Sequence, residues 1–309
     1  MKRRKFILNS ALAVGTLSLR EIKAKKQTEE MNSFPEPDFP CEEFYLWKDG
    51  SSNNGSRKEY RPKIRIYYPT LLNPPKKKFA AVLICPGGGY QVQAPHEGQP
   101  FARLFSNYGI VGAVLTYRVN PDRYPGSYSD ATRAIRMLRS QSLKYNLDPE
   151  KIAIMGFSAG GHLASTVATQ PELYRNPEDD LVGSFSARPD RVILGYPVIS
   201  FIDEFAHMGS AHSLLGETPD PQMLKQLTNY LHVSKDSPPA FLFHNADDGD
   251  VPPANSLRYA EACIQNKVRV EIHVFPKGGH GVGMALGSPD LGIWTENLMD
   301  WLDEWVYRD

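Results

Sequence analysis

Residues 151–168 read KIAIMGFSAGGHLASTVA and place one serine, Ser158, between a short apolar run and a segment of helix-forming residues. Gly156 and Gly160 bracket this serine in a G-x-S-x-G pattern, with Gly161 directly after. A strand that turns sharply into a helix needs small residues at the turn, because the backbone there is strained and packs closely on its neighbours. Such a turn would hold the serine hydroxyl above the end of a strand, facing the positive end of the next helix. Taken alone, the pattern fits an incidental serine in a glycine-rich turn equally well.

The chain around Ser158 alternates short apolar runs with segments of helical period. Apolar residues at i, i+3, i+4 and i+7 predict helices near 101–108, 131–138 and 298–305. This alternation predicts an α/β fold with a mostly parallel central sheet and helices on both faces. Most of the predicted strands are apolar throughout, as strands buried on both faces should be; they lie at 63–68, 80–85, 110–117, 151–155, 191–196, 240–245 and 270–275.

Three further loops follow predicted strands and carry residues typical of catalysis. CPGGGY at 85–90 offers successive glycine N–H groups, FHNADDGDVPP at 243–253 carries three aspartates, and GGHGVG at 278–283 carries His280. Since ligand sites of such folds lie at the carboxyl ends of the strands, we expect these loops to meet near Ser158. The order along the chain, Ser then Asp then His, is the order of α/β-hydrolases.

With these motifs the chain resembles the α/β-hydrolases, and among them bacterial esterases related to hormone-sensitive lipase and to acetylxylan and feruloyl esterases. The resemblance covers about residues 63–305. MGFSAGGHLAS resembles the nucleophile elbow, CPGGGY the H-G-G-G oxyanion loop, FHNADDGDVP the acid loop and GGHGVG the histidine loop. One departure concerns Pro86, which stands where many members have histidine and puts the geometry of the oxyanion loop in question.

The resemblance implies a catalytic triad. Ser158 would be the nucleophile, His280 the general base, and Asp247 the acid that orients His280. Asp248 and Asp250 would then shape the loop or lie in solvent. The backbone N–H groups that would form the oxyanion hole are those of Gly88, Gly89 and Ala159.

The implied function is that of a serine carboxylesterase with a small ester or an acetylated carbohydrate as substrate, acetylxylan first. Alternatives are a feruloyl esterase or a serine peptidase on the same fold; a non-catalytic binding protein would require a broken triad. The segment 201–230 is long enough to form a partial lid over the site. No cofactor and no metal are expected, because His207 and His212 lack an i, i+4 ligand pattern.

The composition excludes polyanion partners. Lys plus Arg and Asp plus Glu each total 35 residues in 309, so no net charge draws the chain to nucleic acid or anionic lipid. Three cysteines without C-x-x-C spacing predict no essential disulfide, with Cys85 and Cys263 buried as small apolar residues.

The N-terminus resembles an export signal. A basic cluster containing Arg3 and Arg4 precedes a short apolar stretch, as in twin-arginine signals that lead to the bacterial periplasm. The stretch is shorter than the roughly 20 residues of a membrane anchor, so no stable anchor is expected. The alternative is a basic tail on a cytoplasmic protein. The predicted organisation is a signal at 1–24, a linker at 25–45 and a catalytic domain at 46–309.

Overall fold

The computed structural model describes residues 41–49, 51–69, 78–176 and 180–308, which belong to one compact unit, Pro40–Asp309. The predicted signal at 1–24 lies outside the described residues. Within them, one sheet of eight strands runs in the order β1-β2-β4-β3-β5-β6-β7-β8. The strands are β1 Cys41–Tyr45, β2 Lys63–Tyr67, β3 Phe79–Cys85, β4 Val111–Thr116, β5 Leu147–Phe157, β6 Arg191–Gly195, β7 Ala240–Asn245 and β8 Val270–Phe275.

The sheet is mostly parallel, as predicted. β3 pairs in parallel with β4 and β5, and the parallel pairing continues through β6 and β7 to β8. All seven strands expected from apolar runs are present. β1 was not expected: it pairs antiparallel with β2 at the edge of the sheet, with Cys41 opposite Tyr67. The predicted linker at 25–45 is therefore wrong at its C-terminal end, because the last five of its residues form a strand of the domain.

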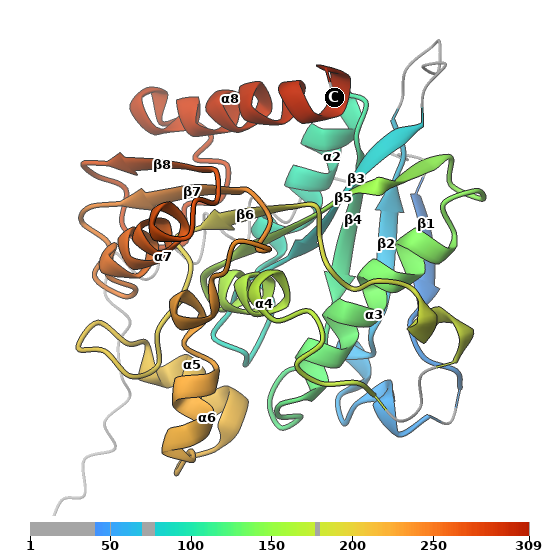
Figure 1. Cartoon of the computed structure of the whole chain (residues 1–309), viewed down its shortest axis with the longest axis horizontal. Helices are drawn as coiled ribbons and strands as arrows, with labels where there is room; N and C mark the ends of the chain where they lie inside the picture. Colours follow the sequence, from blue (N-terminus) through green and yellow to red (C-terminus); the bar gives the residue numbers. More distant parts are fainter. Residues whose placement is uncertain (1–40, 50, 70–77, 177–179, 309) are drawn as a thin grey trace, which may run out of the picture. The chain divides into compact units, whose positions relative to one another are not determined.

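Helices cover both faces of the sheet (Figure 1). Figure 1 shows α2 and α8 on one face and α3, α4 and α7 on the other. Two shorter helices, α5 and α6, lie between β6 and β7, in the segment predicted as a partial lid. The bounds are α2 Gln99–Asn107, α3 Gly126–Ser140, α4 Ser158–Thr169, α5 Met208–Leu215, α6 Pro221–Gln226, α7 Ala254–Gln265 and α8 Pro289–Asp303.

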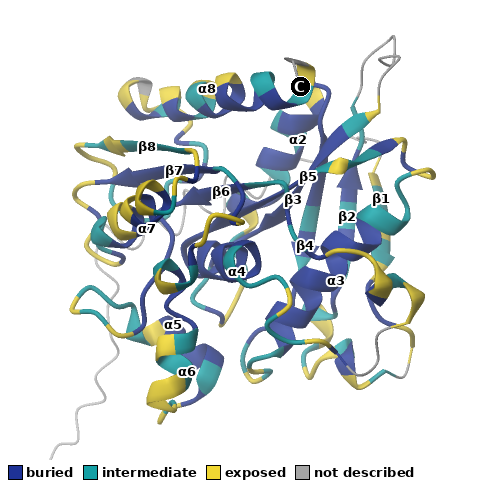
Figure 2. Ribbon diagram, in the orientation of Figure 1, coloured by how far each residue is buried: buried dark blue, intermediate teal, exposed yellow. Residues whose placement is uncertain are grey.

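The core lies on both sides of the central strands (Figure 2). Ala80–Cys85 of β3 and 152–157 of β5 are buried at every position, which explains why these strands read as continuous apolar runs. Cys85 and Cys263 are buried free thiols, as predicted, whereas Cys41 is exposed on β1.

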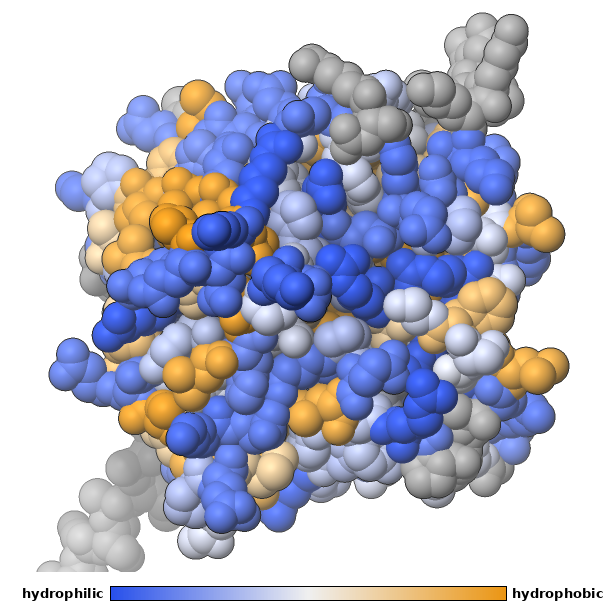
Figure 3. All heavy atoms as spheres, in the orientation of Figure 1, coloured by the Kyte–Doolittle hydropathy of each residue, from blue (hydrophilic) through white to orange (hydrophobic). Residues whose placement is uncertain are grey.

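Outside the core, the surface is largely polar. On the face drawn in Figure 3, hydrophilic residues predominate and hydrophobic ones gather toward α7 and β8. Among the described residues, no helix has the length and apolar character needed to cross a bilayer.

Candidate active site

Ser158 lies at the sharp turn between β5 and α4, and the residue is buried. Its φ angle is +51°, a left-handed conformation that costs a non-glycine residue about 1–3 kcal/mol. Glycines make the turn feasible: a Cβ on Gly160 would come within 2.1 Å of the Cys85 carbonyl oxygen, and one on Gly156 within 2.1 Å of the Gly160 carbonyl oxygen. The G-x-S-x-G spacing is thus a packing requirement that fixes the serine at the carboxyl edge of the sheet.

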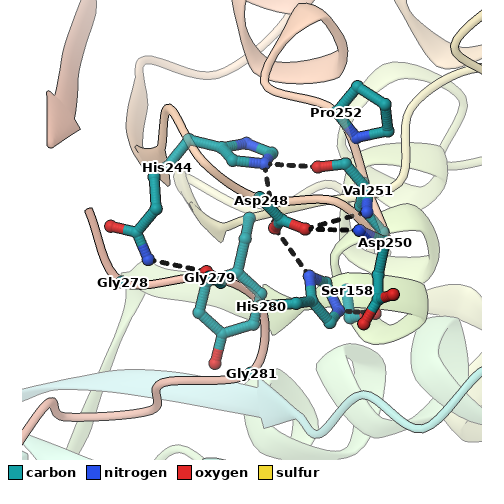
Figure 4. Close-up of polar contacts among 12 residues, drawn as sticks. Ser158, His244, Asp248, Asp250, Val251, Pro252, Gly278, Gly279, His280 and Gly281 are labelled. Carbon is teal, nitrogen blue, oxygen red and sulfur yellow. Dashed lines mark hydrogen bonds and ion pairs between the residues drawn. The ribbon is translucent and has the colours of Figure 1, made fainter. Parts of the chain in front are cut away.

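His280 connects Ser158 to a carboxylate in a continuous line of hydrogen bonds (Figure 4). The Nε2 atom of His280 lies 2.9 Å from Ser158 Oγ, and Nδ1 lies 2.7 Å from Oδ2 of Asp248. A carboxylate only accepts hydrogen bonds, so the proton of the neutral ring is on Nδ1 and Nε2 is free to accept the serine proton. This is the arrangement of a nucleophile, a general base and an orienting acid.

The acid is not the aspartate expected from the sequence. Asp247 is exposed, and its Oδ1 accepts hydrogen bonds from the N–H groups of Gly278 and Gly279, both at 2.8 Å. Asp248 contacts His280 instead. The turn after β7, closed by a 3.2 Å hydrogen bond from Asp248 N–H to the Asn245 carbonyl, directs the second carboxylate inward. The assignment of Asp247 was therefore wrong by one residue: Asp247 anchors the histidine loop.

The Asp248 side chain is fully buried and all its contacts favour the anion. Its Oδ1 accepts from the N–H groups of Asp250 at 3.0 Å and Val251 at 2.9 Å, while Nε2 of His244 lies 3.3 Å from Oδ2. Burial raises the pKa of Asp248, but the hydrogen bonds from His244, His280 and Val251 outweigh it and hold the pKa well below its usual range. These contacts therefore favour the charged form of the acid.

His244 supports Asp248 from within the core. Its Nε2 lies 2.8 Å from the Val251 carbonyl oxygen, and its Nδ1 lies 2.7 Å from Ser256 Oγ. Because the carbonyl can only accept, the proton is on Nε2, which faces both that carbonyl and the Asp248 carboxylate. Sequence reasoning passed over His244 because it lies inside an apolar strand; its position four residues before the acid was the available signal.

The glycine loop after β3 presents unused N–H groups beside Ser158. Tyr117 donates a hydrogen bond of 2.5 Å to the Pro86 carbonyl, and Gly87 N–H donates one of 2.7 Å to Glu97 Oε2. These bonds hold the loop although Pro86 stands at the position of the histidine in the H-G-G-G motif. The N–H groups of Gly88 and Gly89 make no hydrogen bond within the described chain, and Ala159 follows the serine at the start of α4. A Cβ on Gly87 would come within 2.9 Å of Ser158 Cβ, so Gly88 and Gly89 directly follow the point at which this loop approaches the nucleophile.

Glu97 joins the glycine loop to the histidine loop. Its second oxygen, Oε1, accepts a hydrogen bond of 2.7 Å from the Tyr196 hydroxyl, which in turn accepts one of 3.0 Å from Gly283 N–H. Burial, followed by the nearby Glu97 charge, raises the pKa of Tyr196 well above its usual value of 10, so the hydroxyl stays a donor. The Tyr196 ring also contacts His280 edge to face, at 5.0 Å between centroids. The carboxylate of Glu97 is thus part of the site and does not cap α2.

The remaining histidines divide into structural and site-lining groups. His162 is a structural residue: it is buried, with Nδ1 2.8 Å from the Tyr90 hydroxyl and Nε2 2.8 Å from the Leu227 carbonyl. His96 contacts the Gly281 carbonyl at 3.0 Å and so reaches the histidine loop. The described residues contain no group of three or more His, Cys, Asp or Glu side chains placed to hold a metal ion.

The chain matches a known family. Residues 65–262 match the model of the BD-FAE family. The chain is 32% identical over 262 residues to endo-1,4-beta-xylanase B of Butyrivibrio fibrisolvens, a match that covers 83% of the chain and 40% of that protein. It is 30% identical over 230 residues to an acetylxylan esterase of Xylanibacter ruminicola, covering 71% of the chain and 45% of that protein. The chain thus spans less than half the length of these two relatives.

A solved structure resembles the whole described domain. The acetyl ester-xyloside bifunctional hydrolase of Caldicellulosiruptor lactoaceticus superposes with a TM-score of 0.78 at 39% identity, and the match covers 85% of the chain and 96% of that structure. Together with the serine, histidine and carboxylate in line at the carboxyl edge of the sheet, these similarities confirm the α/β-hydrolase fold. The chain belongs to the BD-FAE family of α/β-hydrolase esterases and is a carboxylic ester hydrolase.

Proposed function

We propose that this esterase removes acetyl groups from xylan-type polysaccharides through an acyl-enzyme on Ser158. The observation that carries the mechanism is the line of contacts from Ser158 Oγ through His280 to Asp248, at 2.9 and 2.7 Å. The similarity to an acetylxylan esterase and to an acetyl ester-xyloside hydrolase supports the choice of acyl group and alcohol.

In the first half-reaction, Ser158 Oγ attacks the ester carbonyl carbon while His280 Nε2 takes the hydroxyl proton. The carbonyl π electrons move onto the oxygen, which the N–H groups of Gly88, Gly89 and Ala159 stabilise. Each such donor contributes about 3 to 4 kcal/mol in acyl-transfer enzymes. Collapse of the tetrahedral intermediate breaks the bond to the sugar oxygen, which leaves with the proton from His280.

In the second half-reaction, water replaces the sugar. His280 takes a proton from the water as it attacks the acetyl-serine carbonyl, and the new intermediate collapses to acetate and free Ser158, whose oxygen regains the proton. Asp248 remains ionised throughout and stabilises the imidazolium that forms twice in each cycle. Asp248, not Asp247, therefore carries the role of the acid in this mechanism.

Two measurements test the proposal. A fluorophosphonate probe should label wild-type enzyme once, whereas Ser158→Ala should neither bind the probe nor hydrolyse p-nitrophenyl acetate; turnover by a folded Ser158→Ala protein would refute the mechanism. The substrate is tested by comparing kcat/KM on acetylated xylan fragments, feruloylated fragments and peptide amides. Each excluded methylene shifts selectivity by about 1 to 3 kcal/mol in a tight pocket, so acetyl esters should exceed butyryl esters clearly. A clear preference for the feruloyl ester or the amide would overturn the acetylxylan assignment.

We further propose that the protein is exported to the periplasm by the twin-arginine route. This proposal depends on Arg3 and Arg4 before a short apolar stretch. A periplasmic location agrees with the proposed polymeric substrate, because polysaccharide fragments are met outside the cytoplasm.

A further inference from the structure

A polar cavity of about 630 Å³ lies beside the glycine loop. Gln91 and Val92, at the end of that loop, form one wall. The opposite wall is α5, which contributes Gly209, His212 and Ser213 at positions i, i+3 and i+4 and therefore on one face of the helix. The volume lies within the range of about 300–1,000 Å³ that small-molecule sites occupy.

One wall of the cavity belongs to the glycine loop, and the other is the helix that begins after His207. The N–H groups of Gln91 and Val92 donate hydrogen bonds of 3.0 and 3.2 Å to the Gly88 carbonyl, in the loop that supplies the oxyanion donors. Gln91 is two residues beyond Gly89, so their Cα atoms are at most about 7 Å apart. On the other side, His207 caps the start of α5. Burial and, second, the nearby charge of His280 lower the pKa of His207.

The lining is polar and holds groups without protein partners. Gln91 Nε2 spans the two walls with a hydrogen bond of 3.0 Å to Ser213 Oγ, which leaves its amide oxygen free to accept. The side chains of His212 and Glu217 make no hydrogen bond or ion pair with any part of the chain that the structure describes. Val92 is the single apolar side chain among the lining residues.

The charges at the cavity select a neutral ligand. Arg57 reaches the cavity, but its guanidinium is paired with Glu59 at 2.8 Å and with the Gln91 carbonyl at 2.8 Å. The carboxylate of Glu217 has no such partner and would repel an anion. A lipid chain or an aromatic acyl group would leave the amide, imidazole and carboxylate without hydrogen bonds, whereas sugar hydroxyls can both donate to and accept from them.

We propose that this cavity binds the neutral sugar units that carry the ester, with His212 and Glu217 as specificity-determining residues. The inference rests on the proposed deacetylation of xylan. It places the alcohol side of the substrate between the glycine loop and α5 while the acetyl carbonyl meets Ser158.

The test compares two acetyl esters that differ only in the alcohol. The double variant His212→Ala with Glu217→Ala should lower the ratio of kcat/KM on acetylated xylotriose to kcat/KM on p-nitrophenyl acetate about tenfold, mainly through KM. Glu217→Gln, which keeps the side-chain shape, should lower the ratio less. The matched control Glu261→Ala, on the exposed side of α7, should leave the ratio unchanged. In a Ser158→Ala background, calorimetry should show that the double variant binds unacetylated xylotetraose about tenfold more weakly.

The possible results distinguish a failure of the sugar site from a failure of the proposed function. An unchanged ratio in the double variant, with wild-type enzyme active on acetylated xylotriose, would overturn the sugar site and leave the proposed function standing. Wild-type enzyme that cleaves p-nitrophenyl acetate but releases no acetate from the oligosaccharide would overturn the proposed function, and the sugar site with it.

Discussion

Replacing Asp248 by asparagine should disable the enzyme through the tautomer of His280. The Oδ1 atom of Asp248 accepts two backbone N–H bonds, at 3.0 and 2.9 Å, and in asparagine only the amide oxygen can take that place. The amide NH₂ must then face His280 Nδ1, where the carboxylate oxygen stood at 2.7 Å. The ring would accept that bond and carry its own proton on Nε2, directed at Ser158, so it could not accept the serine proton.

The expected loss is about 10⁴-fold in kcat, as in other serine hydrolases with a Ser-His-Asp triad. This loss corresponds to about 5.5 kcal/mol of transition-state stabilisation. Asp247→Asn should cost less than tenfold. Its amide oxygen can still accept both glycine N–H bonds, so only the charge assistance, about 1 kcal/mol, is lost. The assay is kcat on p-nitrophenyl acetate, with thermal unfolding as a check of folding. A larger loss in Asp247→Asn than in Asp248→Asn would refute the reasoning.

Three further results are expected. Tyr196→Phe leaves Glu97 Oε1 and the Gly283 N–H group without their buried partner, so urea unfolding should show a loss of about 1–3 kcal/mol, together with a lower kcat. Burial lowers the pKa of His162 from 6.5 to about 4, so the unfolded chain binds the proton first as the pH falls. From pH 7.5 to pH 5, wild-type protein should lose about 2 kcal/mol of unfolding free energy that His162→Gln retains. Replacing Arg3 and Arg4 together by lysine should leave precursor in the cytoplasm on fractionation; normal export would contradict the twin-arginine route.

The sequence was most informative where one local rule decides the structure. Apolar runs located seven strands, of which central ones such as β3 and β7 are buried along nearly their whole length. The glycines around Ser158 located the turn because a Cβ on Gly156 or Gly160 would clash with the backbone. β1 was missed because its sequence, CEEFY, carries two glutamates and therefore resembles a polar linker. Pairing with β2 stabilises this strand, and the five residues alone do not predict that pairing.

The choice between Asp247 and Asp248 could not be made from motif order alone. Both aspartates lie in the same loop, and one turn of backbone decides which carboxylate enters the core. A local signal did exist: Asp248 accepts from the N–H groups two and three residues ahead, a type of turn that aspartate favours. The Glu97 to Tyr196 contact joins residues 99 positions apart and had no such signal.

That contact has a consequence for the motions of the site. Because one carboxylate holds Gly87 directly and Gly283 through Tyr196, the glycine loop and the histidine loop cannot open independently without leaving a buried charge short of a partner. The two loops therefore form one cooperative unit of local unfolding, although they follow β3 and β8, which lie four places apart in the strand order. In hydrogen exchange, the amides of Gly87 and Gly283 should become accessible in the same opening event, so the donors for the oxyanion and the general base are preserved or lost together.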